Sequence, residues 1–263
     1  MSVLLMRPRR NEDDRAALED RGLQTIVEPW LEVSAVANEA GAMRLIDLLG
    51  AAGTKWLVVT SLNAVDFWQG QLPAGLLEET IADNPSIRCA AIGESTARRA
   101  RELGATEVLL AEEGTSRYVA DAIAAEEPAP VILPSGSISM RSIPDTLVPK
   151  GFVMHEEVFY TTTVVDTPPA SALQVHHGGL DAVVVRSPSA ARALHQHCPK
   201  PHPSVALIAT GPTTAREMER LGLPVWATSP ASSARAVADT VVHALASPPR
   251  QDTIQDTSEG TGQ

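Results

Sequence analysis

The segment GESTARRARELGA at residues 93–105 returns in altered form as GPTTAREMERLGL at residues 211–223. Gly, Thr, Ala, Arg, Leu and Gly coincide when the two segments are aligned. The same offset continues downstream, where Arg117, Val119, Ala120 and Asp121 fall on Arg235, Val237, Ala238 and Asp239. Upstream, TSLNAV at residues 60–65 resembles RSPSAA at residues 186–191. An offset that persists across a helix, a strand and a second helix favours an internal duplication over two unrelated units that merely look alike.

Short apolar runs alternate with segments of helical spacing along most of the chain. The expected strands are residues 3–6, 24–28, 56–60, 88–92, 107–110, 131–133, 152–160, 182–186, 205–209 and 225–227. Strands that alternate with helices predict an α/β fold with parallel sheets covered on both faces. We therefore expect two flavodoxin-like parallel-sheet lobes.

The distribution of these strands predicts that the first lobe is discontinuous. Residues 37–160 hold one full set of strands, whereas the strands after residue 168 need the two N-terminal ones to complete a second set. Lobe 1 is then residues 1–33 plus 167–246, and lobe 2 is residues 37–160. The crossings at residues 31–36 and 161–165 are β-prone, which predicts two paired linker strands and hinged lobes with a cleft between them. The polar residues 247–263 predict a disordered tail.

Composition narrows the classes of protein that remain. The chain has 263 residues, 44% of them hydrophobic, and a net charge of −11. No apolar run approaches the roughly 20 residues of a membrane span, and the first residues do not resemble a signal peptide. With only two cysteines, a cytoplasmic protein without a disulfide framework is expected. The acidic charge argues against nucleic acid as a partner, and it means that an anionic ligand would need local rather than global attraction.

Small hydroxyl residues and glycine follow five of the expected strands. These turns are Thr60-Ser61, Gly93-Glu94-Ser95-Thr96, Pro134-Ser135-Gly136-Ser137, Ser187-Pro188-Ser189 and Thr210-Gly211-Pro212-Thr213-Thr214. Ligands bind at the carboxyl ends of parallel strands, and helix N-termini favour carboxylates and phosphates. Helix capping alone is an equally good interpretation, because Ser and Thr are common N-caps. The Gly-rich motifs of ATP, NAD and flavin sites are absent from the sequence.

Other candidate residues are basic, or combine His and Cys. Arg7 follows the first strand and Arg141 follows the PSGS turn, so both are candidates for binding an acidic ligand, whereas Arg9 and Arg10 fit a solvated surface. His195, His197, Cys198 and His202 resemble a metal site only loosely. Residues two apart on a helix do not face each other, so a surface helix end is favoured and no metal is expected.

The chain resembles the uroporphyrinogen-III synthase family over nearly its whole length, to about residue 246. The motifs that carry the resemblance are RPR at 7–9, TSLNAV at 60–65, AIGESTA at 91–97, LPSG at 133–136, VFYTTTV at 158–164, SPSA at 187–190 and TGPTTAREMERLG at 210–222. The chain departs from the family pattern at Leu62, at Ala209-Thr210 and at Arg186, which stands where Thr or Ser often precedes the serine.

The resemblance implies two α/β lobes, one of them discontinuous, and a reaction that needs no cofactor. In that reaction, hydroxymethylbilane loses water and closes with inversion of its last pyrrole ring to give uroporphyrinogen III. Tyr160 matches the tyrosine of the family's linker motif, which implies that it assists departure of the hydroxyl group. The family's cleft motifs imply contacts with the substrate carboxylates, and they fall on Thr60, Ser61, Thr96, Ser135, Gly136, Ser187, Ser189, Thr213 and Thr214.

Two other functions fit the same sequence. One is a synthase-like domain that has lost catalysis and senses a tetrapyrrole or a small anion. The other is a two-lobed binding protein for a small anionic ligand, a class that is often exported. We expect a monomer, because closing a cleft between two lobes of one chain needs no partner.

Overall fold

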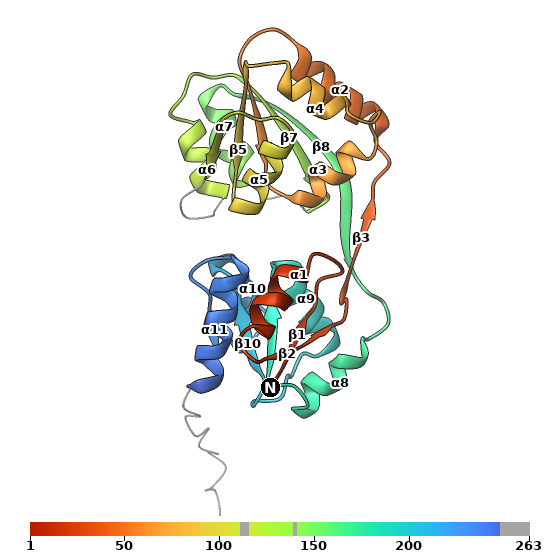
Figure 1. Cartoon of the computed structure of the whole chain (residues 1–263), viewed down its shortest axis with the longest axis vertical. Coiled ribbons are helices and arrows are strands. Elements are labelled where there is room, and N and C mark those ends of the chain that lie inside the picture. Colours follow the sequence, from red (N-terminus) through yellow and green to blue (C-terminus); the bar gives the residue numbers. More distant parts are fainter. Residues whose placement is uncertain (111–115, 139–140, 248–263) are drawn as a thin grey trace, which may run out of the picture. The chain divides into compact units, whose positions relative to one another are not determined.

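The computed structural model describes residues 1–110, 116–138 and 141–247, which form two compact units (Figure 1). Unit 1 combines Met1–Trp30 with the chain from Val165 onward, and unit 2 is the continuous segment Leu31–Val164. Each unit has its own sheet. The segment that was expected to be a disordered tail, residues 247–263, lies outside the described residues except for Ser247.

Unit 1 has a parallel five-stranded sheet of order β11-β10-β9-β1-β2. Its strands are β1 (Ser2–Leu5), β2 (Gln24–Val27), β9 (Ala182–Val185), β10 (Ala206–Ala209) and β11 (Ala227–Thr228). Its helices are α1 (Glu12–Glu19), α8 (Ala170–His177), α9 (Pro188–His197), α10 (Pro212–Arg220) and α11 (Ala234–Ala246). Val3 and Leu5 pack with Leu18 of α1 and Val241 of α11 on one face of the sheet, so these two helices cover that face.

Unit 2 has a six-stranded sheet of order β3-β8-β7-β4-β5-β6. Its strands are β3 (Leu31–Ala35), β4 (Lys55–Val59), β5 (Ile87–Ala91), β6 (Val108–Leu110), β7 (Pro130–Gly136) and β8 (Val153–Val164). Its helices are α2 (Glu39–Gly50), α3 (Leu62–Gln69), α4 (Leu76–Ala82), α5 (Glu94–Glu102), α6 (Ser116–Ile123), α7 (Ser142–Leu147) and the 3-10 turn η1 (Val148–Lys150). All strand pairs are parallel except β3–β8, which is antiparallel.

The side chains of β4 explain why unit 2 has three layers. All five residues of this strand, KWLVV, are buried. Leu57 and Val59 point to the layer of α2, α3, α4 and α5, whereas Trp56 and Val58 point to the layer of α6 and α7. A central parallel strand that is apolar on both faces needs helices on both faces, because each face must be shielded from water.

The two sheets are the same fold in a permuted order. Without β3, the sheet of unit 2 reads β6-β5-β4-β7-β8, and the sheet of unit 1 reads β11-β10-β9-β1-β2. Strands β4 to β8 therefore correspond to β9, β10, β11, β1 and β2. In each sheet the chain connections leave in opposite directions from two neighbouring central strands. We call this place the switch point, and it lies between β1 and β9 in unit 1 and between β4 and β7 in unit 2.

The parallel α/β class predicted from the sequence is confirmed, and each of the ten expected strands is present. One prediction was wrong: the PSGS segment is not simply a turn, because Pro134, Ser135 and Gly136 extend β7 beside β8. The pairing of β7 with β4 ends at Ile132, so beyond it β7 has β8 as its partner. The β4 side is then free of ladder hydrogen bonds, which is where a strand tolerates proline.

Candidate functional site

The switch point of unit 2 brings Ser61, Gly136 and Tyr160 together. Ser61 follows β4 and precedes α3, Gly136 ends β7, and Tyr160 lies on β8 in register with Gly136. The Ser61 Oγ and the Tyr160 hydroxyl are 3.1 Å apart, and either atom can be the donor. The switch point of an open parallel sheet is the general place for a ligand, because the connections on its two sides leave a crevice there.

Backbone and ring contacts both hold Tyr160 in place. Its carbonyl accepts a hydrogen bond from the Ser137 N–H at 2.8 Å, and its backbone also pairs with Ala35 of β3. Its ring stacks on Phe67 of α3, with centroids 6.0 Å apart and planes 17° from parallel. A half-buried phenol fixed in this way has a defined hydroxyl position, so it can donate a hydrogen bond or a proton to a bound ligand.

Gly136 leaves the space that the Tyr160 ring occupies. A Cβ atom built on Gly136 would lie 2.5 Å from Cζ of Tyr160 and 2.8 Å from its Cε1. Real Cβ atoms do not approach other atoms that closely, so any side chain at position 136 would displace the ring. The structure thus places Gly136 beneath the phenol, where its lack of a side chain sets the position of Tyr160.

The other predicted site residues of unit 2 differ in what their side chains do. Thr60 is half-buried at the end of β4. The Thr96 hydroxyl accepts from the Gly93 N–H at 3.1 Å and donates to the Gly93 carbonyl at 2.7 Å, which closes the first turn of α5. Ser135 is buried and donates to the Glu157 carbonyl at 3.3 Å. Arg141 is exposed at the start of α7, with Nε 3.9 Å from Asp145.

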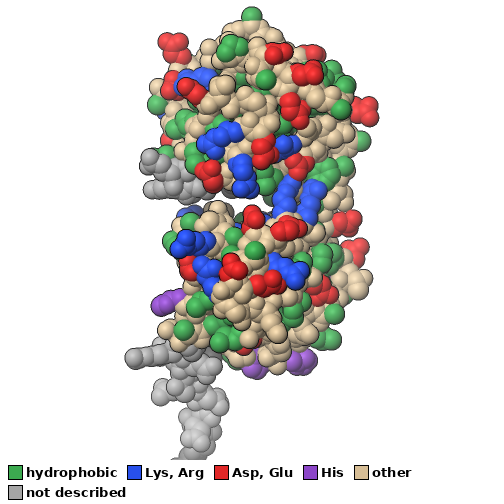
Figure 2. Space-filling model, viewed as in Figure 1, with side chains coloured by type: hydrophobic (Ala, Val, Ile, Leu, Met, Phe, Trp, Pro, Cys, Tyr) green, Lys and Arg blue, Asp and Glu red, His purple; other side chains and the backbone are tan. Residues whose placement is uncertain are grey.

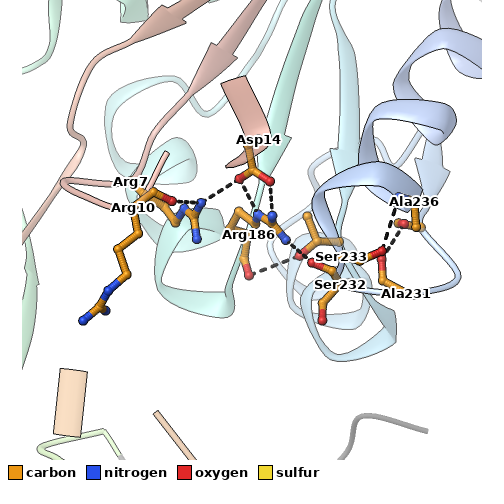
Figure 3. Close-up of polar contacts among 10 residues, drawn as sticks. Arg7, Arg10, Asp14, Arg186, Ala231, Ser232, Ser233 and Ala236 are labelled. Carbon is orange, nitrogen blue, oxygen red and sulfur yellow. Dashed lines mark hydrogen bonds and ion pairs between the residues drawn. The ribbon is translucent and has the colours of Figure 1, made fainter. Parts of the chain in front are cut away.

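The switch point of unit 1 holds charged residues (Figure 3). Arg7 follows β1, Arg186 follows β9, and Asp14 lies on α1. The Asp14 carboxylate is 1% exposed and accepts from Arg7 Nη2 at 2.7 Å and from Arg186 Nε at 2.9 Å. Arg186 Nη2 bonds its second oxygen, and Arg186 Nη1 donates to the Ser232 carbonyl at 2.6 Å. Two guanidinium groups therefore share one buried carboxylate.

Arg7 lies partly buried among charges of both signs. Burial lowers the pKa of Arg7, and the nearby charge of Arg186 lowers it further, while Asp14 and Glu12 act in the opposite direction. The Arg7 Nε is buried and has no hydrogen-bond partner within residues 1–110, 116–138 and 141–247. Acidic and basic side chains are mixed over the face of the molecule in Figure 2, so positive charge gathers locally rather than over a broad surface.

The remaining predicted residues of unit 1 lie at two helix starts. Ser187 is the N-cap of α9, where its hydroxyl accepts from the Ala190 N–H at 3.2 Å, and Ser189 in the same turn is half-buried. In the first turn of α10, Thr213 is exposed and Thr214 is buried. These turns lie at the carboxyl ends of β9 and β10, as the sequence predicted.

A metal centre and a membrane span are both unsupported by the part of the chain that the structure describes. No group of three or more His, Cys, Asp or Glu side chains there could hold a metal ion. His197 of the His/Cys cluster lies with Nε2 2.8 Å from the Val165 carbonyl, and His202 Nδ1 lies 2.7 Å from the Ser204 hydroxyl. None of the helices in those residues is long and apolar enough to cross a bilayer.

Three contributors to these clusters were missed by sequence reasoning. Asp14 is one of three consecutive acidic residues, and only the fold shows which one is buried. The sequence around Phe67 predicts an amphipathic helix, and it gives no sign that this side chain supports Tyr160. Arg186 was noted at the end of its strand and as a departure from the family pattern, but Arg7 and Arg141 were preferred as candidates for binding an acidic ligand. Knowing that β9 is the neighbour of β1 would have predicted that Arg186 lies close to Arg7.

The duplicated sheets and their polar switch points define the class: a parallel α/β protein of two related units in permuted chain order. The model of the uroporphyrinogen-III synthase HemD family matches residues 12–238. The chain therefore belongs to the uroporphyrinogen-III synthase family, cyclising lyases of heme biosynthesis.

Solved structures of the family share the fold. A mutant uroporphyrinogen III synthase from the extremely thermophilic bacterium Thermus thermophilus matches with a TM-score of 0.59 and 16% identity, over 94% of this chain and 99% of that chain. The uroporphyrinogen-III synthetase from Helicobacter pylori matches with a TM-score of 0.55 and 17% identity, over 90% and 96% of the two chains. At such identities the likeness concerns the fold alone.

Proposed function

We propose that this protein cyclises hydroxymethylbilane, with inversion of the last pyrrole ring and loss of water, to give uroporphyrinogen III. Membership of the family supports the reaction. The main structural support for the proposed reaction is the Tyr160 hydroxyl at the switch point of unit 2. It lies 3.1 Å from the Ser61 hydroxyl. It supplies a fixed O–H donor where a parallel sheet binds its ligand.

Tyr160 acts at the departure of the substrate's hydroxyl group. The hydroxyl leaves as water when it gains a proton, which Tyr160 donates while Ser61 holds the phenol. The resulting electrophilic carbon is attacked by the substituted carbon of the last ring, and the spiro intermediate fragments and recloses at the unsubstituted carbon. The proton given at the start is balanced by the proton that the last ring loses at closure.

Orientation accounts for the isomer that forms. The spontaneous reaction closes without inversion, so the protein must hold the chain in the less accessible geometry. The substrate has eight carboxylates, which give many points of attachment. The residues proposed to contact it, in addition to Tyr160, are Arg7, Thr60, Ser61, Thr96, Ser135, Gly136, Arg141, Ser187, Ser189, Thr213 and Thr214. We propose that Arg7 and the exposed or half-buried hydroxyl groups contact the substrate through their side chains. The buried hydroxyl groups shape the turns whose backbone N–H groups bind the ligand.

The test is a product assay on the purified protein. Hydroxymethylbilane is added, the products are oxidised, and the type I and type III isomers are separated. We expect mostly type III. Tyr160→Phe should lower kcat about 100-fold or more, in the range of general acid catalysis, and shift the product toward type I. The matched control is Tyr118→Phe, since Tyr118 is the other tyrosine of the chain and lies on α6.

Two outcomes would contradict the proposal. If the wild-type protein leaves only the type I isomer while binding the tetrapyrrole, it is a non-catalytic binding or sensor protein. If Tyr160→Phe turns over at the wild-type rate, the phenol is structural and the proton comes from elsewhere.

We further propose that the protein works as a cytoplasmic monomer with no nucleic-acid partner. Both proposed clusters lie within one chain, and the net charge of −11 disfavours binding to a polyanion such as DNA. Gel filtration checks the first point, because a dimer would elute at twice the mass of 27.9 kDa.

A further inference from the structure

The two switch points are equivalent places in a duplicated fold, but they carry different chemistry. In unit 1, Ala182 of β9 pairs with Val3 of β1, and in unit 2, Trp56 of β4 pairs with Val131 of β7. Four residues after each of these positions, Arg186 corresponds to Thr60 and Arg7 corresponds to Ser135. The hydroxyls of unit 2 are therefore replaced by guanidinium groups in unit 1.

The arrangement around Asp14 keeps both guanidinium groups at the strand ends. Arg186 contacts the carboxylate through Nε and Nη2, and Nη1 is fixed by the Ser232 carbonyl. Arg7 contacts the same carboxylate through Nη2, which also donates to the Arg10 carbonyl. All three guanidinium nitrogens of Arg186 thus bond within the protein, whereas the Arg7 side chain is 30% exposed.

Charges of both signs lie near Arg7. Arg186 and Arg10 repel the charge of Arg7, whereas Asp14 and Glu12 attract it. The Arg10 side chain extends away from Asp14 in Figure 3. Among the described residues the buried Arg7 Nε has no hydrogen-bond partner, and a partly buried guanidinium is stabilised when its exposed part meets a further acceptor. A carboxylate is the natural complement, because it accepts two parallel bonds from a guanidinium.

We propose that Arg7, Asp14 and Arg186 form a preassembled carboxylate-binding site in unit 1, in which Arg7 contacts a substrate carboxylate and Asp14 and Arg186 are positioning residues. The site rests on the proposed function for the identity of its ligand, a side-chain carboxylate of the linear tetrapyrrole. The equivalent places in the two sheets thus differ in chemistry: the switch point of unit 1 presents charge, and that of unit 2 presents hydroxyl groups.

The first test compares KM with kcat. Arg7→Gln should raise KM for hydroxymethylbilane about tenfold and leave kcat within about twofold, since an anchoring contact acts equally before and in the transition state. Arg186→Gln and Asp14→Asn should raise KM about three- to tenfold. The matched control is Arg21→Gln, because Arg21 also binds one aspartate, Asp239, with two nitrogens, but follows the far end of α1.

A double-mutant cycle separates positioning from a merely structural role. If Asp14 acts through Arg7, the double variant Arg7→Gln/Asp14→Asn should have the KM of Arg7→Gln alone. Additive effects on KM overturn the positioning role. Thermal unfolding of each variant identifies one that does not fold. Should Asp14→Asn fail to fold, Arg7→Lys replaces it in the comparison, and a wild-type KM in both Arg7 variants overturns the site.

A binding measurement distinguishes failure of the site from failure of the proposed function. The probes are a fluorescent porphyrin with eight carboxylates and one with four. We expect Arg7→Gln to weaken binding of the octacarboxylate about tenfold and of the tetracarboxylate less. If the wild type makes no type III product but this pattern holds, the function fails and the site stands. If product forms and Arg7→Gln matches the wild type in KM and binding, the site alone fails. No binding and no product overturn both.

Discussion

At the scale of single residues, the position of one phenol depends on a residue that has no side chain. Tyr160 is held by Ser61, by Phe67 and by its own backbone, and its ring lies where the Cβ of any other residue at position 136 would be. A glycine inside a strand costs stability, so its presence at the end of β7 marks a close approach.

Gly136→Ala tests this dependence. The added methyl group overlaps the ring, so the Ser61–Tyr160 hydrogen bond should break and kcat should fall about ten- to 100-fold toward the value of Tyr160→Phe. The free energy of unfolding should fall by about 1–3 kcal/mol. Steady-state kinetics and urea unfolding measure the two effects. The control is Gly50→Ala in α2, where a Cβ meets nothing within 4 Å. A fully active Gly136→Ala protein would show that the ring position is unimportant.

Part of the candidate site could be predicted from single residues, and part could not. Tyr160 and Arg7 stand in recognisable motifs next to predictable strands. Asp14 and Phe67 gain their roles only from neighbours far away in sequence, such as Arg186 and Tyr160. Thr96 shows the opposite difficulty: its motif suggested ligand binding, whereas its hydroxyl closes the turn that contains it.

At the scale of elements, neighbouring helices α9 and α10 of unit 1 are joined by an ion-pair network. Glu217 of α10 accepts from Arg192 of α9 at 2.7 Å and from Arg220 at 2.8 and 2.9 Å. Its side chain is 13% exposed. The hydrogen bond from Arg220 is the largest cause that lowers the pKa of Glu217, from 4.5 to about 2, and Arg192 adds to it.

A pH dependence of stability follows from this lowered pKa. The contribution of Glu217 is fully present above its ordinary pKa of 4.5 and is lost as the pH falls toward 2. Because both arginines are partly exposed, we expect Glu217→Gln to lose only about 1 kcal/mol of unfolding free energy at pH 7. The deficit should shrink between pH 5 and pH 3 in urea titrations. Glu219→Gln, at an exposed position of the same helix, is the control, and a deficit independent of pH would contradict the assignment.

The sequence predicted the presence of each strand better than the residue at which it ends. β4 and β9 are short apolar runs whose ends are marked by polar residues, so their bounds were close. β7 runs further than expected because β8 supplies its hydrogen bonds as far as Gly136↔Tyr160. β8 continues through the expected linker segment, where Thr161–Val164 pair with β3. The extension of β7 depends on partners more than 20 residues away in sequence, and local composition does not encode it.

At the scale of the whole molecule, the two units are separable along the chain. The Val165 N–H donates to the Trp30 carbonyl at 3.2 Å, so the two ends of the unit 1 segments are adjacent. Trp30 is fully buried, and its indole N–H donates to Ser171 at 2.9 Å. The insertion point of unit 2 is therefore a fixed part of unit 1.

Excision of unit 2 should leave a protein that folds. Residues 31–164 are replaced by two or three glycines between Trp30 and Val165, and residues 31–164 are also produced alone. Each product keeps a complete sheet and its hydrophobic core, so each should unfold cooperatively in urea, as followed by circular dichroism. Neither should make the type III isomer. A shortened chain without a cooperative transition would show that unit 1 needs unit 2 to fold.

The permuted strand order also determines which unit can fold first while the chain is being synthesised on the ribosome. In unit 1, β1 lies between β2 and β9, so the first two strands have no complete sheet to join until residues 182–209 have emerged. At about 5–20 residues per second, that leaves β1 and β2 waiting roughly 10–35 s. Unit 2 is complete in the meantime. The nascent chain therefore finishes its inserted part first and closes its outer part last, with an apolar N-terminal strand pair exposed to chaperones in between.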